Sequence, residues 1–346
     1  MAQVRVGILN DMSDDPAERV TICDWIAREV EALRTAGRIE DEVEFVHACG
    51  LGLPAGSAAA VERAFMDLVR QEAVLIVGPA IGDNALAATP WVEREKVPTI
   101  NWAGAERARG EYMFHVQIGS HEDESLIIAR HLKQIGVNRA GVVYDQSPIG
   151  TKHLEFLGLE ARVLGLDLAP PQAIAPLCED AADAVARVLE EQPDGFVYLG
   201  LGLSAPAVAK ALAARGFAGP RIMNTAGIRG HDPAFAAAID GWRYVDMFSD
   251  GNRTLQRLRT ERGLGPAQLF RGATGYDMGR LVAEGLARAP ALTRAGVRQG
   301  LERVKWLAAA EGEEGTTLGF GIFDRGALHG RYLVLRQWLG GVSVEV

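Results

Sequence analysis

Ala73-Val74-Leu75-Ile76-Val77, followed at once by Gly78-Pro79, is the stretch that best indicates the fold class. Its five consecutive apolar residues, three of them β-branched, are typical of a strand buried on both faces. Both faces of a sheet are buried when helices cover them, as in α/β proteins with parallel strands. We therefore expect a parallel sheet with helices on both sides and a loop that begins at Gly78.

Strand and helix patterns alternate in both directions from this stretch. Upstream, strand-like runs at residues 4–9 and 43–47 are each followed by an amphipathic helical pattern, at residues 20–33 and 58–70. The strands expected downstream are residues 97–102, 140–144, 195–201, 221–225, 242–248, 319–323 and 331–338, and the helices are 84–95, 122–135, 150–158, 180–191, 205–215, 275–289 and 293–304. The alternation predicts two doubly wound parallel sheets, at about residues 3–118 and 120–247. The remaining residues are too few for a third domain.

The composition is that of a two-domain globular protein. The chain has 346 residues, 48% of them hydrophobic, and a formal net charge of −9. An acidic chain is a poor partner for nucleic acid or for an anionic membrane, so neither is expected. No apolar run reaches the roughly 18–20 residues of a membrane helix, so membrane insertion is not expected either.

The first nine residues lack the basic segment and the longer apolar run of a signal peptide. Two interpretations stay open. The protein is cytoplasmic, or a leader has been removed and Met1 replaces it.

Metal and redox sites find little support in the sequence. Cys23, Cys49 and Cys178 are far apart and form no C-x-x-C pair, so at most one disulfide is possible and three reduced thiols are favoured. His121 and His131 are ten residues apart, whereas two ligands on one helix are separated by three or four residues. No metal site is predicted, and the acidic residues near His121 are expected to be a solvated helix start.

Gly200-Leu201-Gly202-Leu203-Ser204-Ala205 is similar to a dinucleotide fingerprint and, in part, to a nucleophile elbow. The next expected strand, residues 221–225, ends without the carboxylate that a bound ribose needs. Pro206 stands where the elbow needs its second glycine. We therefore expect a tight turn with Ser204 as a helix N-cap, no catalytic residues and no cofactor.

The loops that follow the expected strands contain small, apolar or neutral polar residues. In open α/β sheets these loops bind the ligand. They lack the His, Lys, Cys and paired carboxylates that catalysis normally requires, so they indicate a binding site and not an active site.

Several phrases, in this order, resemble the type I periplasmic substrate-binding proteins of the branched-chain amino-acid (Leu/Ile/Val) ABC-transporter group. The matching phrases are Val6-Gly7-Ile8-Leu9 leading into Met12-Ser13, Val74-Leu75-Ile76-Val77-Gly78-Pro79, Val97-Pro98-Thr99-Ile100-Asn101, Val142-Val143-Tyr144-Asp145 leading into Gly150, and Gly275-Tyr276-Asp277. The resemblance covers nearly the whole chain.

The resemblance implies two lobes joined by a three-crossing hinge that close over a ligand. It places residues 1–119 with 249–325 in lobe 1 and residues 120–248 with 326–346 in lobe 2. It also implies an extracytoplasmic location, with the membrane subunits of an ABC transporter as partners. The family disulfide would use Cys49, but its expected partner position is Ile81.

The ligand positions depart from the amino-acid pattern. By resemblance, Gly82 replaces a Ser/Thr and Ala105 a Thr that hold the ligand carboxylate, while Ala226 replaces the Glu that pairs with the ammonium. An ammonium buried without a counter-charge is unfavourable, so we expect a more apolar, aromatic or lipid-like ligand and not a free α-amino acid. The candidate ligand-binding residues are Ser13, Ile81, Gly82, Asp83, Asn84, Trp102, Ala103, Ala105, Ile149, Leu203, Ser204 and Ala226.

Two alternatives to a transport protein stay open: a cytoplasmic ligand sensor of the same fold, and a nucleotide-dependent enzyme. The side chain of Trp102 also has two possible roles. It lines the ligand site, or it packs into the core of lobe 1.

Overall fold

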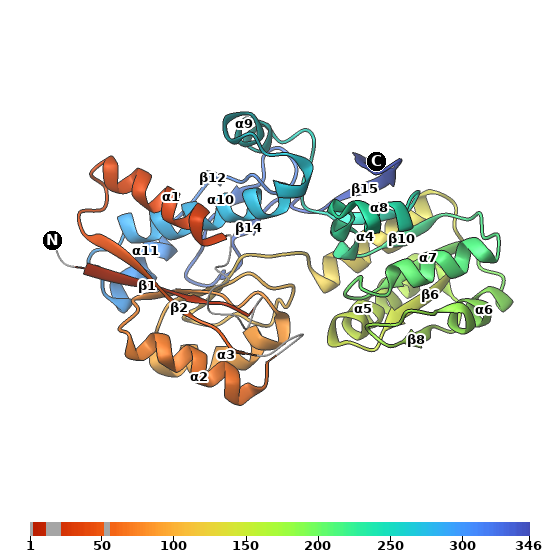
Figure 1. The fold of residues 1–346 in the computed structure, drawn as a ribbon, viewed down its shortest axis with the longest axis horizontal. Coiled ribbons are helices and arrows are strands. Elements are labelled where there is room, and N and C mark those ends of the chain that lie inside the picture. The colour runs from red at the N-terminus through yellow and green to blue at the C-terminus, as the bar shows by residue number, and fades with distance from the viewer. Residues whose placement is uncertain (1–2, 12–21, 52–55) are drawn as a thin grey trace. The chain divides into compact units, whose positions relative to one another are not determined.

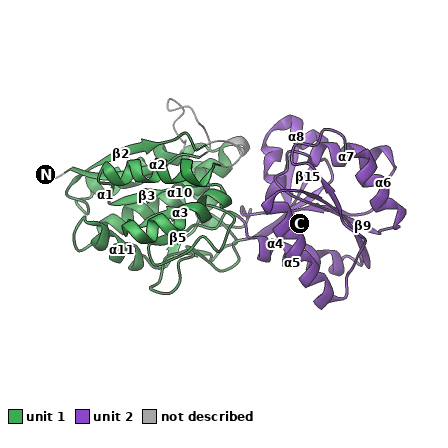
Figure 2. Cartoon of the chain, turned by 90° about the horizontal axis from the view of Figure 1, so that it is seen from below, with its two compact units in different colours: residues 1–118, 250–332 green, residues 119–249, 333–346 purple. Residues whose placement is uncertain are grey.

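The computed structural model describes residues 3–11, 22–51 and 56–346. These residues form two compact units, shown in different colours in Figure 2. Unit 1 comprises residues 1–118 and 250–332, and unit 2 comprises residues 119–249 and 333–346. The chain therefore passes from one unit to the other three times.

Unit 1 is built on a five-stranded parallel sheet of order β2-β1-β3-β4-β5. Its strands are β1 (Gln3–Leu9), β2 (Glu42–Ala48), β3 (Leu75–Val77), β4 (Thr99–Asn101) and β5 (Met113–His115). Its helices are α1 (Ile22–Thr35), α2 (Ala58–Arg70), α3 (Gly82–Glu95), α9 (Arg253–Arg262), α10 (Pro266–Ala287) and α11 (Arg294–Glu302). A small antiparallel sheet adds β12 (Leu307–Ala308), β13 (Thr317–Leu318) and β14 (Leu328–His329).

Helices bury both faces of this sheet, as the apolar stretch at residues 73–77 predicts. Leu75 and Val77 of β3 pack with α1, α10 and α11, whereas Ile76 between them packs with α2 and α3. Figure 1 shows the same two layers, with α1, α10 and α11 on one side of β1 and β2, and with α2 and α3 on the other. All three side chains of β3 are therefore used for packing.

Unit 2 has a sheet of order β16-β15-β11-β10-β9-β6-β7, in which β8 also pairs with β6. Its strands are β6 (Arg139–Asp145), β7 (Asp167–Leu168), β8 (Gln172–Ile174), β9 (Gly195–Leu199), β10 (Arg221–Met223), β11 (Arg243–Asp246), β15 (Val334–Leu339) and β16 (Val342–Glu345). Its helices are α4 (His121–Gln134), α5 (Pro148–Leu164), α6 (Ala182–Glu190), α7 (Ala205–Ala214), the 3-10 helix η1 (Thr225–His231) and α8 (Pro233–Ala238). β15 pairs antiparallel with both β11 and β16, whereas the other strand pairs of this sheet are parallel.

Two expectations near the C-terminus differ from the structure. Residues 326–332, predicted in lobe 2, belong to unit 1, because β14 pairs with β13 and because Gly326 forms a bridge to His115 of β5. The strand expected at residues 319–323 is a turn, in which Gly321 N–H donates to the carbonyl of Asp324. The preceding residues form the short β13 instead.

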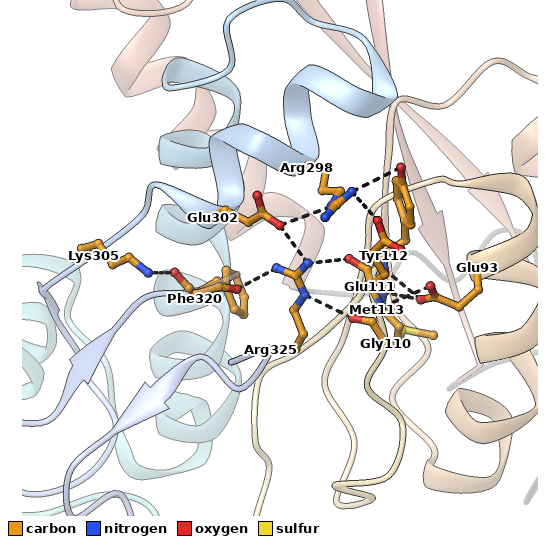
Figure 3. A network of polar contacts seen from close by, with 11 residues as sticks. Glu93, Gly110, Glu111, Tyr112, Met113, Arg298, Glu302, Lys305, Phe320 and Arg325 are labelled. Carbon is orange, nitrogen blue, oxygen red and sulfur yellow. Dashed lines mark hydrogen bonds and ion pairs between the residues drawn. The ribbon is translucent and has the colours of Figure 1, made fainter. Parts of the chain in front are cut away.

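A buried arginine holds this C-terminal turn against the sheet edge (Figure 3). The guanidinium of Arg325 donates to a carboxylate oxygen of Glu302 at 2.8 Å and to the carbonyls of Gly110, Glu111 and Gly321 at 3.2, 2.7 and 2.7 Å. The side chain is only 6% exposed. Arg325 thus joins α11, the turn and the start of β5 within unit 1.

We expect Arg325→Met to lower the free energy of unfolding by about 3–5 kcal/mol, because it breaks a nearly buried ion pair and leaves carbonyl groups unpaired. The matched control is Arg331→Met, whose side chain is 82% exposed and 3.5 Å from Glu313. That exposed pair contributes less than about 1 kcal/mol. Urea denaturation followed by circular dichroism measures both, and equal effects would contradict the assigned role of Arg325.

Candidate functional site

A buried carboxylate, that of Asp11, binds the backbone of the loop after β3 in unit 1. Asp11 follows β1 and accepts hydrogen bonds from the N–H groups of Ala80 and Ile81, both at 2.8 Å, and from Nδ2 of Asn84 at 3.0 Å. Burial raises the pKa of Asp11, and these hydrogen bonds oppose the rise. N–H groups at the start of a helix such as α3 are an anion-binding position. Here the protein's own carboxylate fills that position.

The residues near Asp11 that were predicted to contact a ligand differ in burial and in hydrogen bonding. Asn84 is fully buried, and its Oδ1 accepts from Gly56 N–H at 2.9 Å, so its amide has a structural role and is not available to a ligand. Asp83 is exposed and Ile81 half-buried. Ser13 lies outside the described residues.

Gly82 and Ala105 lie next to each other, although they are far apart in the chain. A Cβ atom placed on Gly82 would be 3.3 Å from Cβ of Ala105. Ala105 packs in turn with Ala85, Ala103 and Ala108. By resemblance, both positions hold the ligand carboxylate; here they lie side by side, and neither residue carries a hydroxyl group.

The loop after β4 is fixed by a neutral histidine. Desolvation lowers the pKa of the buried His115 to about 3. Its Nε2–H donates to the carbonyl of Ala103 at 2.5 Å, and its Nδ1 accepts from Nε of Arg109 at 3.0 Å. Trp102, at the start of this loop, is half-buried and packs against the unit 1 core, so its ring is divided between core and solvent. No sequence pattern indicated the role of His115, because its partners come from the loop and not from its own strand.

A second buried carboxylate closes the corresponding loop of unit 2. Asp145, the last residue of β6, accepts from Tyr198 OH at 2.9 Å and from Leu201 N–H at 2.8 Å. Gly202 N–H donates to Tyr198 OH at 3.2 Å, and Gly200 N–H to Oδ1 of Asn224 at 3.3 Å. The N–H groups of this glycine-rich loop are therefore turned inward, where they cannot bind a phosphate.

Gly202 is needed for a reason other than nucleotide binding. Its φ is +91°, a left-handed conformation that favours glycine. A Cβ atom there would be 2.9 Å from Cδ of Arg229 and 3.1 Å from Cβ of Ala226. The structure thus brings the predicted site residue Ala226 beside this loop, together with Arg229, which no sequence pattern indicated.

Ser204 has a structural role that differs from the predicted one. Its Oγ accepts from Cys178 N–H at 3.0 Å and lies 3.0 and 2.9 Å from the carbonyls of Ala175 and Pro176. It makes no N-cap hydrogen bond and is fully buried, so it is available neither to a ligand nor as a nucleophile.

The two remaining predicted residues of unit 2 belong to different segments of the chain. Leu203 is 43% exposed and lines a hollow of about 800 Å³ along α7, together with Leu177 and Cys178. Ile149 is half-buried in the first turn of α5. Leu203 is therefore placed along the flank of α7.

Glu124, expected as part of a solvated helix start, is instead buried. Its carboxylate accepts from the N–H groups of Ser120 at 2.8 Å and Thr225 at 2.7 Å, and lies 3.4 Å from Nε2 of His153. Desolvation opposes ionisation, but His153 and these N–H groups hold the pKa of Glu124 below its usual value. Glu124 therefore positions η1, the helix that contains Ala226 and Arg229.

Three further observations concern residues 3–11, 22–51 and 56–346. No cluster of three or more His, Cys, Asp or Glu side chains in these ranges is arranged to hold a metal ion. Cys23, Cys49 and Cys178 all lie within them, and none forms a disulfide. None of the helices there has the length and apolar character needed to cross a membrane.

Comparisons of the sequence and of the fold with known proteins find similarity to periplasmic binding proteins. The model of a family described as periplasmic binding protein matches residues 20–328. The fold is similar to a leucine-binding protein from Thermotoga maritima (15% identity, TM-score 0.78, covering 99% of this chain and 97% of that one). It is also similar to a type 1 periplasmic binding protein from Bordetella pertussis (15%, TM-score 0.81, all of both chains). A third similar structure is an ABC-transporter substrate-binding protein from Desulfitobacterium hafniense in complex with Leu (15%, TM-score 0.78, all of both chains). A search of curated proteins found no match.

The buried carboxylate of unit 2 predicts a specific pH dependence. Burial raises the pKa of Asp145 from 3.8 to about 6. A raised pKa means that the folded state holds the proton more tightly than the unfolded state does. The protonated Asp145 therefore stabilises the folded state fully below pH 4, and this stabilisation is lost as the pH rises through 6. The shift corresponds to roughly 3 kcal/mol.

Asp145→Asn removes this titration. We expect the difference in unfolding free energy, wild type minus variant, to decrease by about 2–3 kcal/mol between pH 4 and pH 7.5. Urea denaturation at four pH values measures it. A difference that stays constant over this range would show that Asp145 titrates normally.

Proposed function

The chain belongs to the periplasmic binding protein family, and we propose that it captures a small, largely apolar ligand other than a free α-amino acid for uptake by an ABC-type transporter. The proposed mechanism is capture: ligand binding stabilises a closed form, which the membrane subunits of the transporter recognise. An extracytoplasmic location is part of this proposal.

The chemistry of Gly82, Ala105 and Ala226 is the observation that most favours a ligand other than an amino acid. These side chains can neither donate a hydrogen bond to a carboxylate nor offer a negative charge to an ammonium group. The backbone N–H groups of Ala80 and Ile81, next to Gly82, are already bonded to Asp11. The Thermotoga and Desulfitobacterium proteins are described with leucine, so this chain would differ from them in ligand.

Thermal-shift screening with a metabolite library tests the proposal, with all twenty amino acids as a separate arm. A ligand at 100 times its Kd stabilises the folded state by about 2.7 kcal/mol, which is easily detected. We expect stabilisation by apolar compounds and none by leucine, valine or phenylalanine. Micromolar binding of any of these three in calorimetry would contradict the proposed ligand class.

Closure is tested by small-angle X-ray scattering of the full chain with and without the best compound of that screen. We expect a smaller radius of gyration when the ligand is bound, because closure shortens the distance between the centres of mass of the two units. An unchanged radius at saturation would count against capture by hinge motion.

Trp102→Ala tests whether the exposed part of this ring contacts the ligand. We expect a loss of binding free energy of about 1–3 kcal/mol, together with a loss of stability, since the ring also packs against the unit 1 core. Trp306→Ala is the control, because Trp306 is also in unit 1 and is 82% exposed. Calorimetry measures both variants, and a stability loss with unchanged affinity would restrict Trp102 to a packing role.

A further inference from the structure

Arg229 is an exposed arginine at the carboxyl end of the unit 2 sheet. It lies in η1, after β10, and its Nε donates to the carbonyl of Leu201 at 2.7 Å. Its Cδ lies over Gly202, whose missing side chain leaves room for it. The loop after β9 therefore holds the aliphatic part of Arg229 in one place, and the guanidinium is pre-oriented.

The charge of Arg229 has no ion-pair partner within 4 Å among the residues that the structure describes. Its two terminal nitrogens make no hydrogen bond to this part of the chain, so four N–H donors in a planar fork remain available. Asp145 is the carboxylate that attracts it, but that group is buried and its oxygens already accept from Tyr198 and Leu201. Partial desolvation lowers the pKa of the guanidinium, as expected where a cation lacks a close counter-ion.

Unit 1 has the opposite character at its corresponding strand ends. Asp11 fills the N–H groups at the start of α3, and its negative charge would repel a second anion there. Gly82 and Ala105 add no hydroxyl group that could compensate. An anionic group on a ligand is therefore favoured beside Arg229 and disfavoured beside Asp11.

We propose that Arg229 binds a carboxylate of the ligand, and that the ligand is an organic acid with an apolar body and no α-ammonium group. This inference rests on the proposed function, since it concerns the ligand of that site. A guanidinium pairs with a carboxylate through two parallel N–H···O bonds. Neither a lysine ammonium nor a glutamine amide in place of the guanidinium can reproduce this geometry.

The test compares compounds that share a carbon skeleton. Branched, straight-chain and aromatic carboxylic acids of four to twelve carbons are screened beside their primary amides and, where these exist, the α-amino acids of the same skeleton. 4-Methylpentanoate, 4-methylpentanamide and leucine form one such set, and 3-phenylpropanoate, 3-phenylpropanamide and phenylalanine form another. We expect the best acid to bind at least tenfold more tightly than its amide and its amino acid in calorimetry.

Two substitutions assign the effect to one side chain. Arg229→Gln should weaken binding of the best acid at least tenfold and leave the affinity of its amide unchanged, whereas Arg229→Lys should retain part of the difference. Arg215→Gln is the control, because Arg215 is exposed at the far end of α7 in the same unit. Thermal unfolding of each variant without ligand verifies that the fold is intact.

The outcomes separate this inference from the proposed function. Amides or amino acids that bind as tightly as the acids, or an Arg229→Gln variant with unchanged affinity for the acids, would overturn the role of Arg229 and leave ligand capture standing. If no compound of any class stabilises the protein, the proposed function fails as well.

Discussion

Burial of both faces of each parallel sheet is the constraint on which the rest of the molecule depends. In unit 1, Leu75 and Val77 pack on one helical layer and Ile76 on the other, so all three side chains of β3 are used for packing. The backbone groups at the strand ends have a separate requirement. They leave the sheet in an apolar environment and need hydrogen-bond partners.

Both units meet this need with a carboxylate from a neighbouring strand. Asp11 follows β1 and binds the loop after β3, which is paired with β1; Asp145 ends β6 and binds the loop after β9, which is paired with β6. In both cases a buried acid holds the backbone of a candidate ligand loop in one conformation. The acid thereby uses N–H groups that would otherwise bind an anion, so the polar recognition of a ligand is left to side chains.

The sequence predicted what depends on local pattern and missed what depends on distant partners. Apolar runs and helical periodicity indicated the two sheets and most helices, whereas α9 was missed because only Leu255 and Leu258 of its residues are buried. Asn84 and Ser204 looked like ligand contacts because they stand after strands. Their actual partners, Asp11 and the backbone at Ala175, are at distant positions in the chain that no spacing rule connects to them. Arg229 stands in a short glycine-containing segment without helical or strand periodicity, so no sequence pattern indicated it.

The glycines at positions 200 and 202 have a different role here from the one that similar glycines have in a dinucleotide site. In a dinucleotide site, glycines let a phosphate approach free N–H groups at a helix start. Here the N–H groups of Gly200, Leu201 and Gly202 are bonded to Asn224, Asp145 and Tyr198. The missing side chain of Gly202 instead admits the aliphatic part of Arg229. In a dinucleotide site such glycines expose backbone donors to an anion, whereas here they make room for a guanidinium at the same edge of the sheet. The positive charge at this edge therefore comes from a side chain and not from the backbone.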